Sequence, residues 1–117
     1  MELLNKSESD IIEIVTPIAK IMAAAWSSDD YHKFIGFFEK DKKGLLTESD
    51  FKTQRSWVAE ELGIYSINTI DSIHKNPCNV VITWKINFTN RSEPGLGIYR
   101  FKGKDGKIIV SSCIYFH

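Results

Sequence analysis

The sequence has little of what marks several common classes of protein. Its 117 residues include two cysteines and three prolines, and 15 basic and 15 acidic side chains cancel to a formal net charge of zero. A chain without surplus Lys and Arg is poorly suited to neutralising phosphates, so we expect no nucleic-acid partner. The longest apolar runs, such as 21–26, are far shorter than the roughly 20 residues that span a bilayer, so we expect no membrane segment.

Cysteine is also too sparse for metal or redox chemistry. Cys78 and Cys113 lie in different segments, without C-x-x-C spacing and without a partnered histidine, which argues against a metal centre or a thioredoxin-like site. The first residues lack a charged stretch followed by an apolar one, so no secretory signal is indicated. We therefore expect a cytoplasmic protein with no metal and no cofactor.

The zero net charge is a cancellation between two halves of the chain. Residues 64–117 hold seven Lys and Arg against three Asp and Glu, whereas residues 1–63 hold eight against twelve. A field of this kind could steer an anionic ligand or partner.

What is present fits one α+β domain spanning residues 1–117. Hydrophobic residues make up 43% of the chain, and its length lies within the roughly 100–150 residues of a typical domain. The first half has helical periodicity and the second half has the alternation and β-branched content of strands, which is the order of an α+β protein.

The first predicted helix runs from about Ser9 to Ala25, with apolar side chains recurring at three- and four-residue steps. Pro17 interrupts its backbone hydrogen bonding, so either the helix kinks there or Thr16 caps a fresh start. The apolar stripe keeps its phase across Pro17, which favours a kink.

Two further helices follow. Ser27 and Asp30 resemble a capping box that opens a short second helix, and residues 39–46 have the composition of a solvated loop. Thr47 and Asp50 form a capping box for a third helix, which Gly63 ends. Its predicted core face is Phe51, Val58 and Leu62, with Trp57 on the flank.

The four predicted strands are 64–74, 79–90, 96–103 and 107–116, separated by turn sequences at 76–77, 93–95 and 105–106. A two-residue turn at 105–106 would place Phe101 opposite Val110 and Tyr99 opposite Ser112. A glycine bulge in place of that turn would shift the register by one residue and mix the two faces.

This arrangement resembles the nuclear transport factor two-like superfamily, a cystatin-related fold. The resemblance is carried by Ala23-Ala24-Ala25-Trp26 at the end of the first helix, the acidic start of the second, Leu62-Gly63, and the strand around 80–85. It implies three helices packed on a curved four-stranded antiparallel sheet that forms a cone. In that family an apolar pocket opens at the wide end of the cone, and homodimers commonly form through the outer sheet face. Members include isomerases, dehydratases, cyclases and transport adaptors, so the fold does not decide the function.

We expect a small-ligand-binding or protein-interaction module with an apolar pocket between helices and sheet. Such pockets are mostly apolar with a few polar groups, and the alternative for the same aromatic residues is simple core packing. The candidate ligand is a small hydrophobic molecule. The predicted pocket residues are Trp26, Tyr31, Trp57, Trp84, Tyr99, Phe101 and Ser112.

The alternative is an isomerase, dehydratase or cyclase that acts on a small carbonyl or ring substrate. That chemistry needs a carboxylate base and a hydrogen-bond donor in the interior. Asp71 would point inward if the inner set of the first strand is Tyr65, Ile67, Thr69 and Ile73, and Tyr99, or Tyr31, would then be the donor. The other interpretation is that Asp71 is an ordinary carboxylate near the end of the strand, bonded to turn amides or water.

The outer face of the last hairpin carries more apolar side chains than a solvated face needs. We expect a homodimer to cover them. The predicted dimer surface is Ile98, Arg100, Ile109, Cys113 and Tyr115.

Overall fold

The computed structural model describes residues 3–39 and 46–117, so most of the predicted loop at 39–46 lies outside the described residues. Its elements, in chain order, are η1 (Leu3–Asn5), α1 (Glu8–Ser27), α2 (Tyr31–Ile35), α3 (Glu48–Leu62), β1 (Tyr65–Lys75), β2 (Val80–Phe88), β3 (Arg91–Lys104) and β4 (Lys107–Phe116). Glu39, which we assigned to the solvated loop, is instead buried, and its carboxylate pairs with Lys102 Nζ at 3.0 Å.

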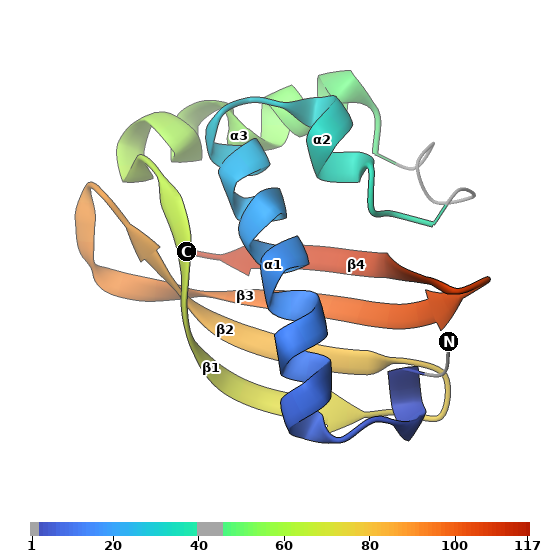
Figure 1. Ribbon diagram of the computed structural model, residues 1–117. Helices are drawn as coiled ribbons and strands as arrows, with labels where there is room; N and C mark the ends of the chain where they lie inside the picture. The colour runs from blue at the N-terminus through green and yellow to red at the C-terminus, as the bar shows by residue number, and fades with distance from the viewer. Residues whose placement is uncertain (1–2, 40–45) are drawn as a thin grey trace.

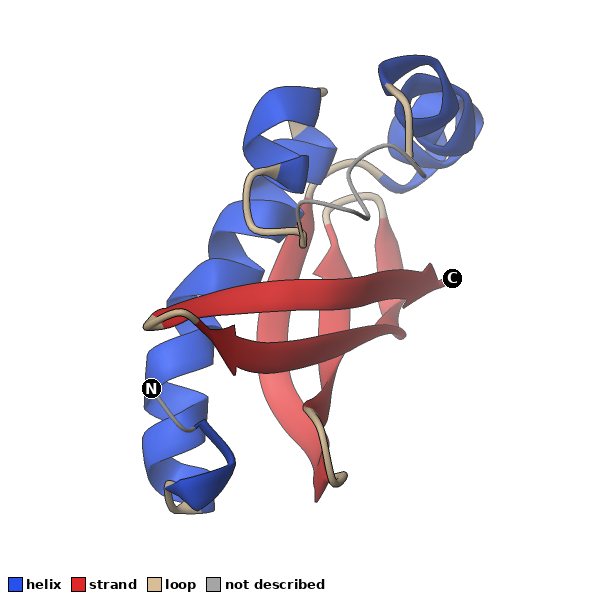
Figure 2. Ribbon diagram, turned by 90° about the vertical axis from the view of Figure 1, so that its right-hand side faces the viewer, coloured by secondary structure: helices blue, strands red, loops and turns tan. Residues whose placement is uncertain are grey.

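The four strands form one antiparallel sheet in the order β1-β2-β3-β4, and the sheet is open and curled. α1 runs diagonally across one face of it, while α2 and α3 lie together beyond the β4 side (Figure 1). The view turned by 90° shows the same division, with the two shorter helices at one end of the molecule (Figure 2). No helix in the described part of the chain is long and apolar enough to cross a membrane.

α1 is one continuous helix, and the alternative of a fresh start at Thr16 is wrong. Ser7 is its N-cap, with Oγ accepting a hydrogen bond from the Asp10 amide at 3.1 Å. Pro17 lies inside the helix, as the unbroken stripe indicated. The residues it buries against the sheet are Ile11, Val15, Ala19, Met22 and Ala25.

The caps of the next two helices differ in how well they were predicted. Ser27 belongs to α1 and does not cap α2; Asp30 does, by accepting a hydrogen bond from the Lys33 amide at 3.2 Å. The capping box of Thr47 and Asp50 at the start of α3 is confirmed. Gly63 ends α3 at φ 81°, and a Cβ there would clash with Thr89 Oγ1, so this position requires glycine.

The predicted turn at 93–95 is wrong. β3 begins at Arg91 and runs through that segment, and the chain turns at residues 89–90 instead. Pro94 is exposed, close to the place where the pairing of β2 with β3 shifts between Ile86 and Phe88. Proline is tolerated near such an irregularity because no regular ladder hydrogen bond is lost.

The last hairpin keeps its predicted turn but changes register farther along. Asp105 and Gly106 both have positive φ, and Phe101 lies opposite Val110 as counted. The register then shifts by one residue, so Tyr99 lies opposite Cys113 and the predicted pairing of Tyr99 with Ser112 is wrong. The cause is a bulge within β4, at Ser111, and not a bulge in the turn.

This bulge exchanges the two faces of β4. Cys113 and Tyr115, which we assigned to the outer dimer surface, face the interior. Ser112, assigned to the interior, shares the outer face with Ile114, which lies opposite Ile98. The dimer surface predicted from the sequence is therefore wrong at two of its five positions.

β1 is irregular in the same way. Its pairing with β2 shifts between Ile67 and Ile70 and again between Ile70 and Ser72. Ile70 and Ile73 are half-buried, whereas Thr69 and Asp71 are exposed. The prediction that Asp71 points inward is therefore wrong, because it assumed unbroken alternation along the strand.

Candidate functional site

A cavity of about 410 Å³ lies where the end of α1, α2, α3 and β4 meet. Its volume falls within the roughly 300–1,000 Å³ that is typical of ligand sites. The apolar residues that border it are Trp26, Phe34, Phe38 and Leu46, together with Ile114, which lies on the outer face of β4 and also borders the cavity. Its polar part is formed by Gln54, Ser111, Ser112, Cys113, Tyr115 and His117.

Trp26, in the last turn of α1, is the central aromatic residue of this wall. Its ring packs on Phe51 and on Tyr115, each with ring centroids 5.4 Å apart, and on Phe34 at 5.7 Å. Arg55 on α3 holds this end of α1, because its guanidinium donates to the carbonyl of Trp26 at 2.6 Å and to the next carbonyl at 3.0 Å. The position of the Trp26 ring is therefore fixed from several sides.

The chain after α2 forms the next part of the wall by pairing with β4. The Val110 amide donates to the Phe37 carbonyl at 2.7 Å, and the Glu39 amide donates to the Val110 carbonyl at 3.2 Å. This short parallel bridge places Phe38 beside Val110, the residue of β4 that precedes Ser111.

Two polar atoms at the cavity are buried without a hydrogen-bond partner among the described residues. They are Nε1 of Trp26 and Oγ of Ser111. Trp26 as a whole is only 6% exposed. A buried polar group left unpaired costs about 1–3 kcal/mol, which applies to Ser111 Oγ, whereas the Trp26 N–H lies near the Tyr65 hydroxyl and acts on its pKa.

Tyr65 packs against the Trp26 indole, with ring centroids 6.1 Å apart, and it also meets His117, at 5.6 Å. The Tyr65 hydroxyl and His117 Nε2 are 2.5 Å apart. Burial raises the pKa of Tyr65, while the nearby indole N–H and the charges of Arg55 and Arg91 act in the opposite direction. Burial, and then the charge of Arg91, lower the pKa of His117 below 6.5. Near neutral pH the imidazole is therefore uncharged, and its Nε2 shares a hydrogen bond with the Tyr65 hydroxyl.

A second polar group joins β3 to β4 behind the cavity. The hydroxyls of Tyr99 and Tyr115 are 2.5 Å apart, and the Tyr99 hydroxyl donates to the Ala19 carbonyl at 3.4 Å. Burial raises the pKa of both tyrosines well above 10, and raises the pKa of the Cys113 thiol to about 12. At neutral pH these groups are uncharged and serve as hydrogen-bonding groups.

Of the seven predicted pocket residues, Trp26 and Ser112 border the cavity. Trp84 packs edge-on against Tyr99 and Phe101, at 5.3 and 6.2 Å, and these three fully buried residues belong to the core. The core-packing alternative is therefore correct for them.

The other two predicted pocket residues lie elsewhere on the helices. The Tyr31 hydroxyl donates to the Leu46 carbonyl at 2.5 Å, which ties α2 to the start of α3, and its ring packs on Phe51. Trp57 is 66% exposed and borders none of the cavity.

The predicted acid–base pair is not brought together. Asp71 is exposed on β1, whereas Tyr99 is fully buried on β3 and does not border the cavity. Within residues 3–39 and 46–117, no three His, Cys, Asp or Glu side chains form a cluster able to hold a metal ion.

Sequence reasoning missed the β4 wall of the cavity, which contains Ser111, Cys113, Tyr115 and His117. The inward residues of β4 are spaced by three and then two positions from Val110 onward, in place of a constant two. Such a change of spacing marks a bulge, and it was the one signal in the sequence that could have identified this wall.

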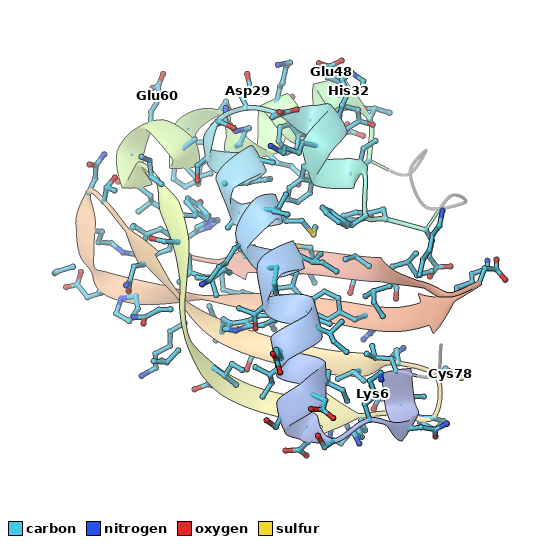
Figure 3. The ribbon with its side chains drawn as sticks, viewed as in Figure 1. Lys6, Asp29, His32, Glu48, Glu60 and Cys78 are labelled. Atoms are coloured by element: carbon cyan, nitrogen blue, oxygen red, sulfur yellow. The ribbon has the colours of Figure 1, made fainter. Side chains whose placement is uncertain are left out.

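Three acidic side chains of the helical half, Asp29, Glu48 and Glu60, lie at the end of the molecule opposite the β1–β2 turn (Figure 3). Asp29, Glu48 and Glu60 project from the helices away from the sheet, together with His32, while Cys78 lies near the far turn (Figure 3).

Comparison with known proteins identifies the fold but no sequence family. The sequence matches no protein-family model, and no curated protein is similar to it at a significant level. Among solved structures, a designed protein whose name carries the NTF2 label superposes with a TM-score of 0.56 at 13% identity, over 88% of this chain and 98% of that one.

Two natural proteins also superpose. Bd1075 of Bdellovibrio bacteriovorus matches with a TM-score of 0.55 at 8% identity, over 94% of this chain but 42% of its own length. RPA3114 of Rhodopseudomonas palustris, a SEC-C motif containing protein, matches with a TM-score of 0.51 at 11% identity, over 93% of this chain and 91% of that one.

The molecule is thus an α+β protein whose three helices pack on an open, curled, four-stranded antiparallel sheet. Its fold is NTF2-like, as the resemblance in the sequence indicated. Because identities this low establish a fold and nothing more, the function has to be argued from the cavity itself.

Proposed function

We propose that this chain is a binding module that holds a small apolar molecule in the cavity bordered by Trp26, Phe34, Phe38 and Tyr115. The observation that carries the proposal is a cavity of about 410 Å³ whose lining is mostly apolar and aromatic, with a few polar side chains. Ligand sites commonly combine apolar walls with a small number of polar groups in this way.

The structure does not contain the interior carboxylate–tyrosine pair on which the enzymatic alternative depended. It needed a carboxylate and a tyrosine facing one interior space. Asp71 is exposed, and the titratable groups at the cavity are tyrosine, cysteine and histidine side chains whose shifted pKa values favour their neutral forms near pH 7. We therefore name no second function.

The proposal is tested with a neutral apolar dye, N-phenyl-1-naphthylamine, whose fluorescence rises in apolar surroundings. We expect saturable binding to the wild type. Gln54 is exposed on α3 and borders the cavity, so Gln54→Trp should fill part of it and weaken dye binding without unfolding the protein. Thr53→Trp places the same bulk on the neighbouring exposed position, which does not border the cavity, and should leave binding unchanged. Equal binding by the two variants would contradict the proposal.

We further propose a homodimer formed through the outer face of β3 and β4. Ile114 and Phe116 are 50% and 52% exposed, and their Cα partners on β3 are Ile98 and Leu96, so the four side chains form one apolar surface. The half-buried Ile109 extends it, and Arg100 is an exposed flank. A face of this kind on a small protein is a common dimer interface.

Sedimentation equilibrium tests the dimer directly. The wild type should have twice the monomer mass of 13.4 kDa at micromolar concentration, and Ile114→Lys should have the monomer mass. Ser66→Lys, which adds the same charge to an exposed position on β1, is the matched control and should remain dimeric. A wild-type protein of monomer mass would overturn this proposal.

A further inference from the structure

We infer that the free edge of β4 is a docking site for one extended segment of a partner protein, which adds a strand beside Cys113 and Tyr115 and places an uncharged apolar side chain in the cavity. The inference goes beyond the proposed function, because it rests on the main chain of β4 and holds whether or not a small molecule also binds in the cavity.

The cavity reaches around the edge of β4. It borders the consecutive residues from Ser111 to Tyr115. Successive side chains of a strand point to opposite faces, so a cavity on one face alone would border every second residue. Ser112 and Ile114 lie on the outer face, and they border the cavity as well. The space therefore opens along the edge of the strand, where its main chain is within reach of a partner.

Val110 shows which pairs between β3 and β4 are hydrogen-bonded. Its amide and its carbonyl both bond to the short segment after α2, so they point away from β3. The main-chain groups of Phe101, its partner on β3, therefore point toward β2. In a regular antiparallel strand this direction recurs at every second residue. Because β3 pairs with β2 without a shift from Phe101 to Gly95, the groups of Tyr99 and Gly97 point toward β2 as well.

Cys113 and Tyr115 consequently leave their main-chain groups on the free edge. They are the β4 partners of Tyr99 and Gly97, so neither pair is hydrogen-bonded across the two strands. In the described part of the chain, no main-chain hydrogen bond joins Cys113 or Tyr115 to a residue outside the sheet. Unpaired amides and carbonyls along a strand edge are a template for one more strand.

The chain already uses this edge in the way that we infer for the partner. The Val110 amide donates to the Phe37 carbonyl at 2.7 Å, and the Glu39 amide donates to the Val110 carbonyl at 3.2 Å. Between these two bonded residues, Phe38 borders the cavity. A partner segment farther along β4 continues this parallel pairing, with its main chain on the edge and every second side chain in the cavity. Peptides that add a strand to a sheet commonly gain affinity from the first contact and specificity from the second.

The walls of the cavity select the side chain that enters. Trp26, Phe34, Phe38 and Leu46 are apolar, and none of the Asp, Glu, Lys and Arg side chains in the described residues borders the space. A charged side chain would be desolvated there without an ion partner, which is costly, whereas an aromatic ring packs well on other rings. The segment therefore carries a large apolar side chain such as phenylalanine.

A second copy of this chain does not suit the edge. A strand added to a sheet lies roughly 4.8 Å from its neighbour, so a single extended segment needs little room beside β4. Two copies joined edge to edge would also bring together their α2 and α3 helices, which lie beyond the β4 side of the sheet (Figure 1). The occupant is therefore one segment of a different protein.

Amide hydrogen exchange, followed by NMR, reads this pairing in the wild type. The probe is the capped peptide acetyl-Lys-Thr-Val-Phe-Val-Thr-Lys-amide. At about ten times its Kd, exchange of the Cys113 and Tyr115 amides should slow about ten-fold, because the bound form hides them. The Ile114 amide, which faces β3, is the internal control and should exchange slowly with and without peptide. Unchanged exchange at Cys113 and Tyr115 in the complex would overturn the inference.

Modified peptides separate the main-chain contribution from the side-chain contribution, with affinities measured by titration calorimetry. N-methylation of the two valines should abolish binding, because they occupy the places of Phe37 and Glu39, whereas N-methylation of the phenylalanine should be tolerated. Equal losses would contradict pairing through the main chain, and the reverse order would contradict the parallel direction. Serine in place of the phenylalanine should weaken binding about ten-fold or more, and equal affinity would show that the cavity receives no side chain.

The dye experiment keeps this inference distinct from the proposed function. Dye binding without peptide binding would overturn the docking site and leave the small-molecule module standing. Peptide binding without dye binding would overturn that module and support the docking site.

Discussion

Replacing the hydroxyls of Tyr99 and Tyr115 by hydrogen, singly and together, tests whether the pair behind the cavity acts as one unit. Their oxygens are 2.5 Å apart, and the Tyr99 hydroxyl also donates to the Ala19 carbonyl at 3.4 Å, which links β3 and β4 to α1. Tyr→Phe keeps each ring and removes only the polar atom. The variants are Tyr99→Phe, Tyr115→Phe and the double substitution.

The magnitudes follow from what each change leaves behind. Tyr115→Phe removes one hydrogen bond but leaves Tyr99 its bond to Ala19, so we expect a loss of about 1–2 kcal/mol in the free energy of unfolding. Tyr99→Phe removes both bonds and leaves the Tyr115 hydroxyl buried and unpaired, so we expect about 2–3 kcal/mol. The double variant leaves no unpaired hydroxyl. It should therefore cost less than the two single losses together, by about 1 kcal/mol.

Urea unfolding followed by tryptophan fluorescence measures all four proteins. The midpoint concentrations should shift while the dependence on urea concentration stays constant, because the surface exposed on unfolding does not change. In thermal melts, each kcal/mol should lower Tm by roughly 3–6 °C in a domain of this length. Losses that add to within about 0.3–0.5 kcal/mol would show that the two hydroxyls act independently and would refute the reasoning.

Three further outcomes follow from the structure. The pKa of Tyr99 and Tyr115 is raised by burial above the ordinary value of 10.0, so the unfolded chain releases these protons first as pH rises. The free energy of unfolding should therefore fall as pH rises above about 10, by up to about 1.4 kcal/mol per pH unit for each tyrosine. The urea midpoint of the double Phe variant should fall less steeply with pH than that of the wild type. Gly63→Ala should lower the free energy of unfolding by about 1–3 kcal/mol, because of its positive φ and the contact with Thr89 Oγ1; an unchanged urea midpoint would contradict this. Asp71→Asn should leave both the urea midpoint and the dye affinity unchanged within error, because the carboxylate is exposed. A clear loss of dye binding would contradict this and indicate a role for Asp71 in binding.

The helical half of the fold could be predicted closely because helix signals are local. The apolar stripe of α1 and the capping box at Thr47 each lie within a few residues of sequence, and both are confirmed. The error at Ser27 has a non-local cause. Ser27 donates to the Ala23 carbonyl and accepts from the Tyr65 amide, a strand residue 38 positions away, and no local pattern reveals that partner.

The candidate site was predicted less well because it depends on how distant strands pair. Trp26 was identified from its place at the end of an apolar helix, but the β4 wall depended on counting residues from the turn, and one extra residue at Ser111 reversed the result. The same holds for β1, where two shifts in pairing place Asp71 on the exposed side. A period-2 pattern is reliable only between irregularities, and bulges carry weak sequence signals.

The extra residue in β4 also affects how related sequences should be aligned. A relative that lacks a residue near Ser111 would present its later β4 side chains in the opposite phase, even with every other amino acid conserved. A one-residue gap is therefore structurally meaningful within this strand and not in the Asp105-Gly106 turn, where loop-length variation is usually placed. Moving that gap by a few columns exchanges the inward side chains of β4, Cys113 and Tyr115, with the outward ones, Ser112 and Ile114. In distant comparisons, the length of the segment between Val110 and Cys113 identifies the cavity wall better than the identity of any single residue in it.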